Sequence, residues 1–118
     1  MAYAKDMNGA VAIANTQLDD SWVAVTSLPE DKLFRSAFTL VGDAVVEDLT
    51  LAKDLAHEKR RAKRDADLQP LDREYTYASE VAEPKRKKVR DDNAALQAEI
   101  DGAATVEDLK GIYHASLA

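Results

Sequence analysis

Residues 38–46 have the sequence FTLVGDAVV, and a helical pattern begins directly after them at Glu47. Phe38–Val41 and Ala44–Val46 are rich in β-branched and aromatic residues, which fit well in strands. Gly42-Asp43 between them is a two-residue hairpin signal, because glycine adopts a positive φ at little cost. The sequence therefore predicts a β-hairpin that is followed at once by a helix.

Further strands are expected upstream of this hairpin. Val11 and Ile13 alternate with alanines, and Ser21–Thr26 is rich in residues that favour strands. Pro29 predicts a break between the last of these strands and the hairpin. We therefore expect a small N-terminal antiparallel β unit within residues 1–46.

From Glu47 the chain is expected to be helical. One apolar stripe of the first helix consists of Ala52, Leu55, Ala56, Ala62 and Ala66. Pro70 is expected to interrupt or bend this helix, because proline lacks an N–H and clashes with the preceding turn. A short helix is then expected through residues 71–82.

Pro84 is expected in the first turn of the next helix, where proline is tolerated. The apolar side of this helix consists of Val89, Leu96, Ile100 and Ala103. Gly102 is expected to end it, and Thr105–Asp108 resembles a capping box that opens a final amphipathic helix. The sequence therefore predicts an α+β chain. A β-rich region over residues 1–46 precedes a helical hairpin and a short C-terminal helix over residues 47–118, without independent domains.

The charge of the chain is unevenly distributed. Its formal net charge is −6, from 22 acidic and 16 basic residues. Residues 57–90 hold 11 of the basic and 7 of the acidic residues, a local balance of +4, and the basic ones concentrate in 59–64 and 85–90. The net negative charge of the whole chain argues against a general nucleic-acid-binding protein. No segment approaches the roughly 18 apolar residues of a membrane span, so no membrane partner is expected.

Residues 31–38, DKLFRSAF, resemble an Asp-Arg-Thr-Phe-Arg-Asn-Ala-Trp signature found in small proteins of tailed bacteriophages, often encoded near tail genes. Asp31, Phe34, Arg35 and Ala37 match this signature, whereas Leu33 and Ser36 depart from it. Elements similar to those of the same family follow in order at residues 71–74, 90–91 and 103–112.

Residues 58–65 also resemble the Lys-Arg-x-x-Arg-Asp start of phage tail-assembly chaperones and tail-fibre assembly proteins, without the Thr-Asp-Trp that follows there. Together these resemblances imply a phage origin and an association with the tail. They imply no catalytic residue.

Three aromatic or basic residues of the N-terminal region are candidate partner-binding residues. Phe34 and Arg35 fit either a packing corner between strands and helices or a contact with a partner, because arginine binds carboxylates with both arms of its fork. Trp22 fits either a half-buried core position or an exposed interface anchor. Both interpretations stay open for each residue.

In the basic runs, Arg60, Arg64 and Lys87 are candidates for docking to an acidic neighbouring subunit. A clustered positive face can also bind phosphate, and it can equally be a solvated helix surface. The overall acidity argues against the phosphate interpretation.

Catalytic and metal-binding patterns are missing from the sequence. His57 and His114 are the only histidines, no His-x-x-x-His occurs, and there is no cysteine. We therefore expect no enzymatic activity, no metal site and no cofactor.

The resulting functional expectation is a non-enzymatic structural or assembly protein of a phage virion, associated with the tail or tail fibre. It is made in the host cytoplasm. Its expected partners are other phage structural proteins, in many copies on a symmetric particle. The alternatives are a transient tail assembly chaperone, and an acidic inhibitor of a host defence protein. The mixed charge of residues 57–90 makes the inhibitor less attractive.

Overall fold

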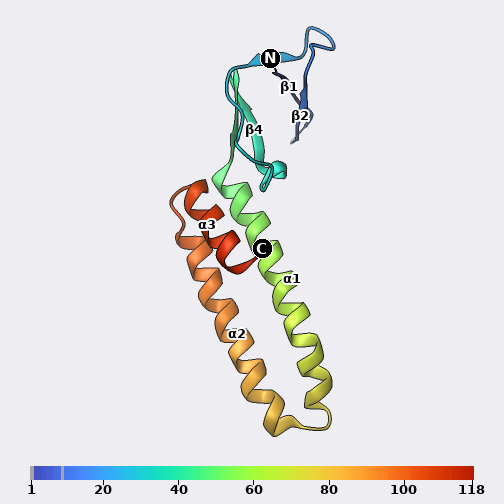
Figure 1. The fold of residues 1–118 in the computed structure, drawn as a ribbon, viewed down its shortest axis with the longest axis vertical. Helices are drawn as coiled ribbons and strands as arrows, with labels where there is room; N and C mark the ends of the chain where they lie inside the picture. The colour runs from blue at the N-terminus through green and yellow to red at the C-terminus, as the bar shows by residue number, and fades with distance from the viewer. Residues whose placement is uncertain (1, 9) are drawn as a thin grey trace. The chain divides into compact units, whose positions relative to one another are not determined.

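The computed structural model describes residues 2–8 and 10–118 and has the predicted α+β fold. Its strands are β1 (Ala2–Asp6), β2 (Val11–Ala14), β3 (Val23–Val25), β4 (Phe38–Val41) and β5 (Ala44–Glu47), with a 3₁₀ turn at Arg35–Ala37. Its helices are α1 (Leu49–Tyr75), α2 (Ser79–Gly102) and α3 (Val106–Ser116) (Figure 1). The chain divides within α1 into two compact units, one ending at Leu55 and one beginning at Ala56, which we describe separately.

The first three strands form an antiparallel sheet in the order β2-β1-β3. Its central strand, β1, lies in a segment whose sequence does not predict a strand. Alanine, lysine and aspartate are depleted in strands, and they make up most of Ala2–Asp6. In the register, Ala4 lies between Ile13 of β2 and Val23 of β3, and it is fully buried. A strand with so little apolar side chain is therefore held by its two neighbours.

The hairpin formed by β4 and β5 is confirmed. Val41 pairs with Ala44, which leaves Gly42-Asp43 as a two-residue turn with φ 62° at Gly42. The chain after β3 joins the two sheets, because the Val45 N–H donates to the Ser27 carbonyl at 2.9 Å. The shared core of this unit consists of Ala4, Val25, Phe38 and Val45.

Asp48 begins α1 by capping it. Its side chain accepts a hydrogen bond from the Leu51 N–H at 2.9 Å, and its own N–H donates to the Ala37 carbonyl at 2.8 Å. A short polar side chain at this position satisfies a donor of the first helical turn that has no partner within the helix. The 3₁₀ turn and the start of α1 are thereby tied together.

The expected interruption at Pro70 is wrong, because α1 continues through Pro70 to Tyr75. Proline removes one helical hydrogen bond, but Pro70 is exposed, so water can reach the carbonyl that is freed. Two ion pairs to α2 hold the turns beyond it: Arg86 Nε lies 2.9 Å from Asp72 Oδ1, and Lys85 Nζ lies 3.2 Å from Glu74 Oε1. These surface ion pairs do not by themselves offset a proline in a helix interior, which costs about 3 kcal/mol.

The short helix expected over residues 71–82 is also wrong, since residues 76–78 form the turn between α1 and α2. Pro84 is consequently the sixth residue of α2 and lies beyond its first turn. The turn closes locally: the Ala78 N–H donates to the Glu74 carbonyl at 2.8 Å, and the Thr76 hydroxyl donates to the Arg73 carbonyl at 2.7 Å.

The apolar stripe expected on α1 is only partly correct. Ala52 and Ala56 are buried, but Ala62 and Ala66 are exposed. Arg60, which is not part of the expected stripe, is buried. Apart from Glu83, the buried and half-buried positions of α2 recur in alternating steps of four and three residues, a coiled-coil spacing. They are Ala82, Arg86, Val89, Asn93, Leu96 and Ile100. Arginine and asparagine thus occupy positions in the helix pair that usually hold apolar side chains.

The end of α2 and the whole of α3 follow the sequence prediction. α2 ends at Gly102, and the Thr105 hydroxyl accepts a hydrogen bond from the Asp108 N–H at 3.1 Å, as a capping residue does. Ile100, Leu109 and Leu117 are buried, and α3 packs against α2.

Candidate partner-binding surface

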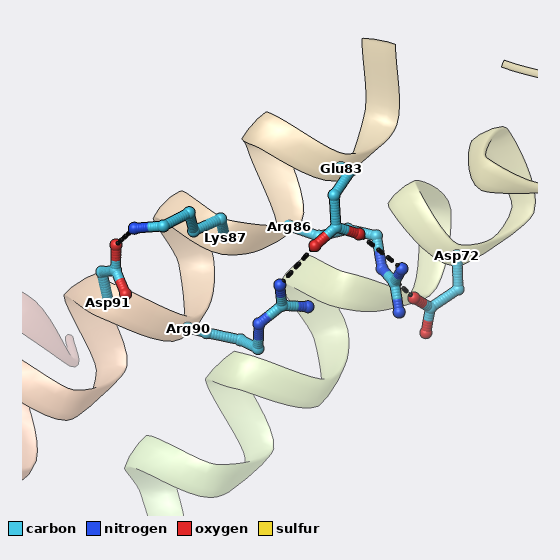
Figure 2. A network of polar contacts seen from close by, with 6 residues as sticks. All are labelled: Asp72, Glu83, Arg86, Lys87, Arg90 and Asp91. Atoms are coloured by element: carbon cyan, nitrogen blue, oxygen red, sulfur yellow. Dashed lines mark hydrogen bonds and ion pairs between the residues drawn. The ribbon is translucent and has the colours of Figure 1, made fainter. Parts of the chain in front are cut away.

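The turn end of the helix pair is held by an arginine that touches both helices. Arg86 of α2 forms ion pairs with Asp72 of α1 and Glu83 of α2, both at 2.9 Å (Figure 2). Its guanidinium also lies 4.6 Å from the centre of the Tyr75 ring. Arg90 completes the network through a 2.6 Å contact with Glu83. One guanidinium therefore pairs with carboxylates of two helices and stacks on an aromatic ring, as its planar shape allows.

Glu83 is the carboxylate on which the two arginines of α2 converge. The hydrogen bond from Arg90 lowers the pKa of Glu83 below its ordinary value, and the charge of Arg86 lowers it further. The pairs lie at the surface, where water and salt weaken them, so each contributes little to stability by itself.

Arg60 of α1 has a different environment, because it is only 5% exposed. Its Nε donates to His57 Nδ1 at 3.1 Å, and its Nη1 donates to Asn93 Oδ1 at 3.0 Å. Because His57 Nδ1 accepts that bond, Nε2 is the imidazole nitrogen that donates to Asp101 Oδ1, at 2.7 Å. A chain of polar side chains therefore crosses between α1 and α2 at two points.

No ion pair within residues 2–8 and 10–118 joins Arg60 to a carboxylate. Burial lowers the pKa of the Arg60 guanidinium, and the charges of Arg61 and Arg64 lower it further, while Asp101 acts in the opposite direction. Arg60 is thus a buried cation whose direct partners are two neutral groups.

A hollow of about 480 Å³ lies beside Arg60, within the unit that begins at Ala56. We call it the Arg60 hollow. Lys63 and Arg64 of α1 line it with Arg60, and the α2 side contributes the apolar side chains of Val89 and Leu96. Its remaining charged side chains are acidic: Asp67, Asp92 and Glu99. Its volume lies within the roughly 300–1,000 Å³ that is typical of ligand pockets.

Two of the three carboxylates in the Arg60 hollow are already paired with lysines. Lys63 Nζ lies 2.9 Å from Asp67 Oδ2, and Lys88 Nζ lies 2.6 Å from Asp92 Oδ2. Arg64 is paired with its neighbour Asp65 at 3.2 Å. Among the charged groups that line the hollow, Arg60 therefore stands out as a cation without a direct ion pair in the described chain, and the charge of Asp101 reaches it only through His57 and from a distance.

The three candidate residues of the N-terminal unit have three different environments. Phe34 is 1% exposed, which favours the packing interpretation over direct contact with a partner. Arg35, directly after it, is exposed. Trp22 is half-buried directly before β3, at an edge of the three-stranded sheet, and Gln17 Nε2 donates to its carbonyl at 3.1 Å.

The candidates in the helical unit are only partly brought together. Arg60 and Arg64 line the same hollow, whereas Lys87 is exposed and pairs with Asp91 at 2.6 Å, away from the contacts of Arg86 with α1 (Figure 2). Sequence reasoning missed Arg86, which connects the two helices. Its position in the coiled-coil spacing of α2 could have identified it.

Large apolar side chains are exposed on both units. Leu18, Val41 and Val46 are exposed in the N-terminal unit, and Val41 and Val46 belong to the two strands of the hairpin. In the helical unit, Tyr75, Tyr77 and Val81 are exposed at the turn between α1 and α2, with Tyr77 81% exposed. We call these last three residues the turn patch.

Within the described residues, no group of three or more histidine, cysteine, aspartate or glutamate side chains is arranged to hold a metal ion. None of the helices in that part of the chain is both long and apolar enough to cross a membrane. No family model, curated protein or solved structure matches this chain.

Proposed function

We propose that this chain is a non-enzymatic structural or assembly protein of a tailed phage, associated with the tail or tail fibre, which works through contacts with other phage proteins. The observation that carries the contact function is the exposure of large apolar side chains on both units. Among the described residues, the most exposed of these are Tyr77 at 81%, Leu18 at 65% and Val41 at 62%.

Exposed apolar side chains that lie close together are typical of surfaces that another protein covers. The turn patch supports such a surface, because two exposed tyrosines and an exposed valine occur within seven residues at one turn. Tyrosine combines a large apolar ring with a hydroxyl, and it is enriched in the cores of protein interfaces. A protein partner therefore accounts for the patch more directly than a small molecule does.

The phage assignment is supported by the sequence resemblance at residues 31–38. Phe34 and Ala37, which match that signature, are both buried, and they flank the exposed Arg35. A signature that contains buried residues next to an exposed arginine is consistent with a shared fold that presents one charged side chain.

Mass spectrometry of purified virions of the encoding phage tests the proposal. A structural protein is present in a fixed ratio to the tail proteins, and gentle disassembly recovers it with them. Absence from virions, together with recovery bound to a tail protein in infected lysate, would identify a transient assembly chaperone. Recovery with a host protein alone would refute the proposal and support an inhibitor of host defence.

A further inference from the structure

We propose that the Arg60 hollow receives an acidic side chain of a partner protein, whose carboxylate pairs with the Arg60 guanidinium. An aliphatic residue of the partner, next to the acidic one, covers Val89 and Leu96. This inference rests on the proposed function, because it names the chemistry by which the assembly partner is recognised.

The first argument is the buried charge. Arg60 is 5% exposed, and within the described residues it donates hydrogen bonds only to His57 Nδ1 and Asn93 Oδ1. These neutral acceptors satisfy single N–H groups but do not neutralise the guanidinium. A buried cation is costly unless an anion pairs with it, and a planar guanidinium has the geometry to bind a carboxylate through two parallel bonds. The free protein therefore contains a cation that an incoming carboxylate would stabilise.

The second argument is that the hollow can admit such a group. Its volume of about 480 Å³ exceeds what one carboxylate needs, and Val89 and Leu96 offer apolar surface beside the charge. A site of this composition fits a carboxylate side chain with an aliphatic residue next to it. Interfaces commonly combine one charged anchor with apolar packing around it.

The acidic side chains that line the hollow favour a single carboxylate over a nucleic acid as its ligand. Asp67, Asp92 and Glu99 line the same hollow as Arg60, Lys63 and Arg64, so the charges of the lining sum to zero. A polyanion that followed the basic side chains would pass close to three carboxylates and would be repelled. A single carboxylate aimed at Arg60 avoids most of this repulsion, which favours a protein partner.

Sodium propionate is a suitable probe, because it has the carboxylate and aliphatic carbons of a glutamate side chain. The full-length protein, labelled with ¹⁵N, is titrated with propionate while the Nε–H signal of Arg60 is followed. Sodium chloride at equal ionic strength is the reference. We expect a saturating shift at Arg60 with propionate and only a small linear drift with chloride. Coinciding curves for the two salts would overturn the assignment.

Ala95→Asp is the sharpest variant, because Ala95 is exposed on α2 and lines the hollow. It places a carboxylate in the hollow without changing the core, so the propionate shift should be lost while circular dichroism still shows the folded helices. Ala98→Asp is the matched control: it adds the same charge to an exposed position of the same helix that does not line the hollow. Equal loss in both variants would show an effect of net charge alone and refute the site.

Arg60→Met and Arg61→Met extend the test to assembly. Arg61 is an exposed neighbour that does not line the hollow. Removing one member of a buried charge pair weakens a complex by at least about tenfold, so Arg60→Met should reduce incorporation into particles by that factor and Arg61→Met should not. Circular dichroism confirms the fold of each variant, and Ala95→Asp answers the question if Arg60→Met does not fold.

Two further outcomes separate this inference from the proposed function. If the protein is a virion component but propionate gives no saturating shift, the partner site is wrong and the proposed function stands. If propionate saturates at Arg60 but the protein is absent from particles and tail complexes, the proposed function fails while the carboxylate site remains. Tighter Arg60-dependent binding of single-stranded oligothymidylate than of propionate would refute the protein partner and indicate a phosphate site.

Discussion

Phe34 and Arg60 are both buried, and burial acts on these two side chains in opposite directions. Phe34 is 1% exposed, and removing a phenylalanine side chain from water stabilises a protein by about 1.5–3 kcal/mol. Arg60 loses hydration of its charge and gains only neutral hydrogen-bond partners in return. Burial of Phe34 therefore stabilises the fold, whereas burial of Arg60 leaves a charge that a carboxylate of another molecule would stabilise.

Phe34→Ala should lower the free energy of unfolding by about 3 kcal/mol, because it removes buried apolar area and leaves a cavity. Urea denaturation followed by circular dichroism measures the change. Arg35→Ala is the control, since Arg35 is exposed one residue further on and its loss should change the free energy by less than about 0.5 kcal/mol. An unchanged midpoint for Phe34→Ala would mean that its ring does not support the fold.

At the level of secondary-structure elements, two glycines should respond to substitution in opposite directions. Gly42 has φ +62° in the turn between β4 and β5, where a Cβ meets no atom within 4 Å but the backbone conformation itself is unfavourable. Gly42→Ala should therefore destabilise the protein by about 1–2 kcal/mol. Thermal unfolding followed by circular dichroism measures the loss.

Gly111 is the matched comparison, because it lies within α3, and a Cβ there also meets no atom within 4 Å. Gly111→Ala should stabilise the protein by roughly 0.5–1 kcal/mol, since alanine has the higher helix propensity. If both variants shifted the melting temperature in the same direction, backbone conformation would not be the cause.

The network on α2 predicts a dependence of stability on pH. The pKa of Glu83 is lowered in the folded chain, first by the hydrogen bond from Arg90, so the carboxylate is favoured by folding. This contribution is present above the ordinary pKa of 4.5 and is lost as the pH falls from there through the lowered folded value. Glu83→Gln should flatten the fall of the melting temperature over that acidic range.

The control for this prediction is Glu58→Gln, which removes the same charge from an exposed position of α1. Melting temperatures are recorded from neutral pH downward for the wild type and both variants. An acid response of Glu83→Gln identical to the wild type would mean that the contacts from Arg86 and Arg90 do not stabilise the folded state.

At the scale of the whole molecule, each unit buries few large side chains and leaves several exposed. The core shared by the two sheets contains Ala4, Val25, Phe38 and Val45, and the helix pair uses arginine and asparagine at positions that usually hold apolar residues. Alanines and polar groups remove little apolar area from water, so the free chain gains only modest stability from packing. Contact with a partner that covers the exposed residues would add stability by mass action.

Tyr77→Ser tests this at the most exposed aromatic residue. Tyr77 is 81% exposed, so the free energy of unfolding of the isolated protein should change by less than about 0.5 kcal/mol. If the turn patch contacts a partner, incorporation into particles should fall. Gln97→Ser, at an exposed polar position elsewhere on α2, should leave both quantities unchanged. Wild-type incorporation of Tyr77→Ser would remove the turn patch from the interface.

Features that depend on neighbours in the sequence were predicted correctly. The turn at Gly42-Asp43, the cap at Thr105 and the stop at Gly102 each follow from the chemistry of a few adjacent residues. The candidate site was less predictable. The spacing of four residues predicts that Arg60 and Arg64 share one side of a helix, but nothing local indicates the hollow that they line.

Local chemistry defined the hairpin turn, the helix caps and the order of strands before helices, because φ preferences and capping hydrogen bonds act over three or four residues. The packing of elements against one another decided the rest. β1 is a strand because β2 and β3 flank it, and α1 continues past Pro70 into turns whose Asp72 and Glu74 pair with α2. The environment of Arg60 also depends on packing, because Arg60 donates to Asn93, which lies 33 residues further along the chain in α2. No local sequence pattern extends over that distance.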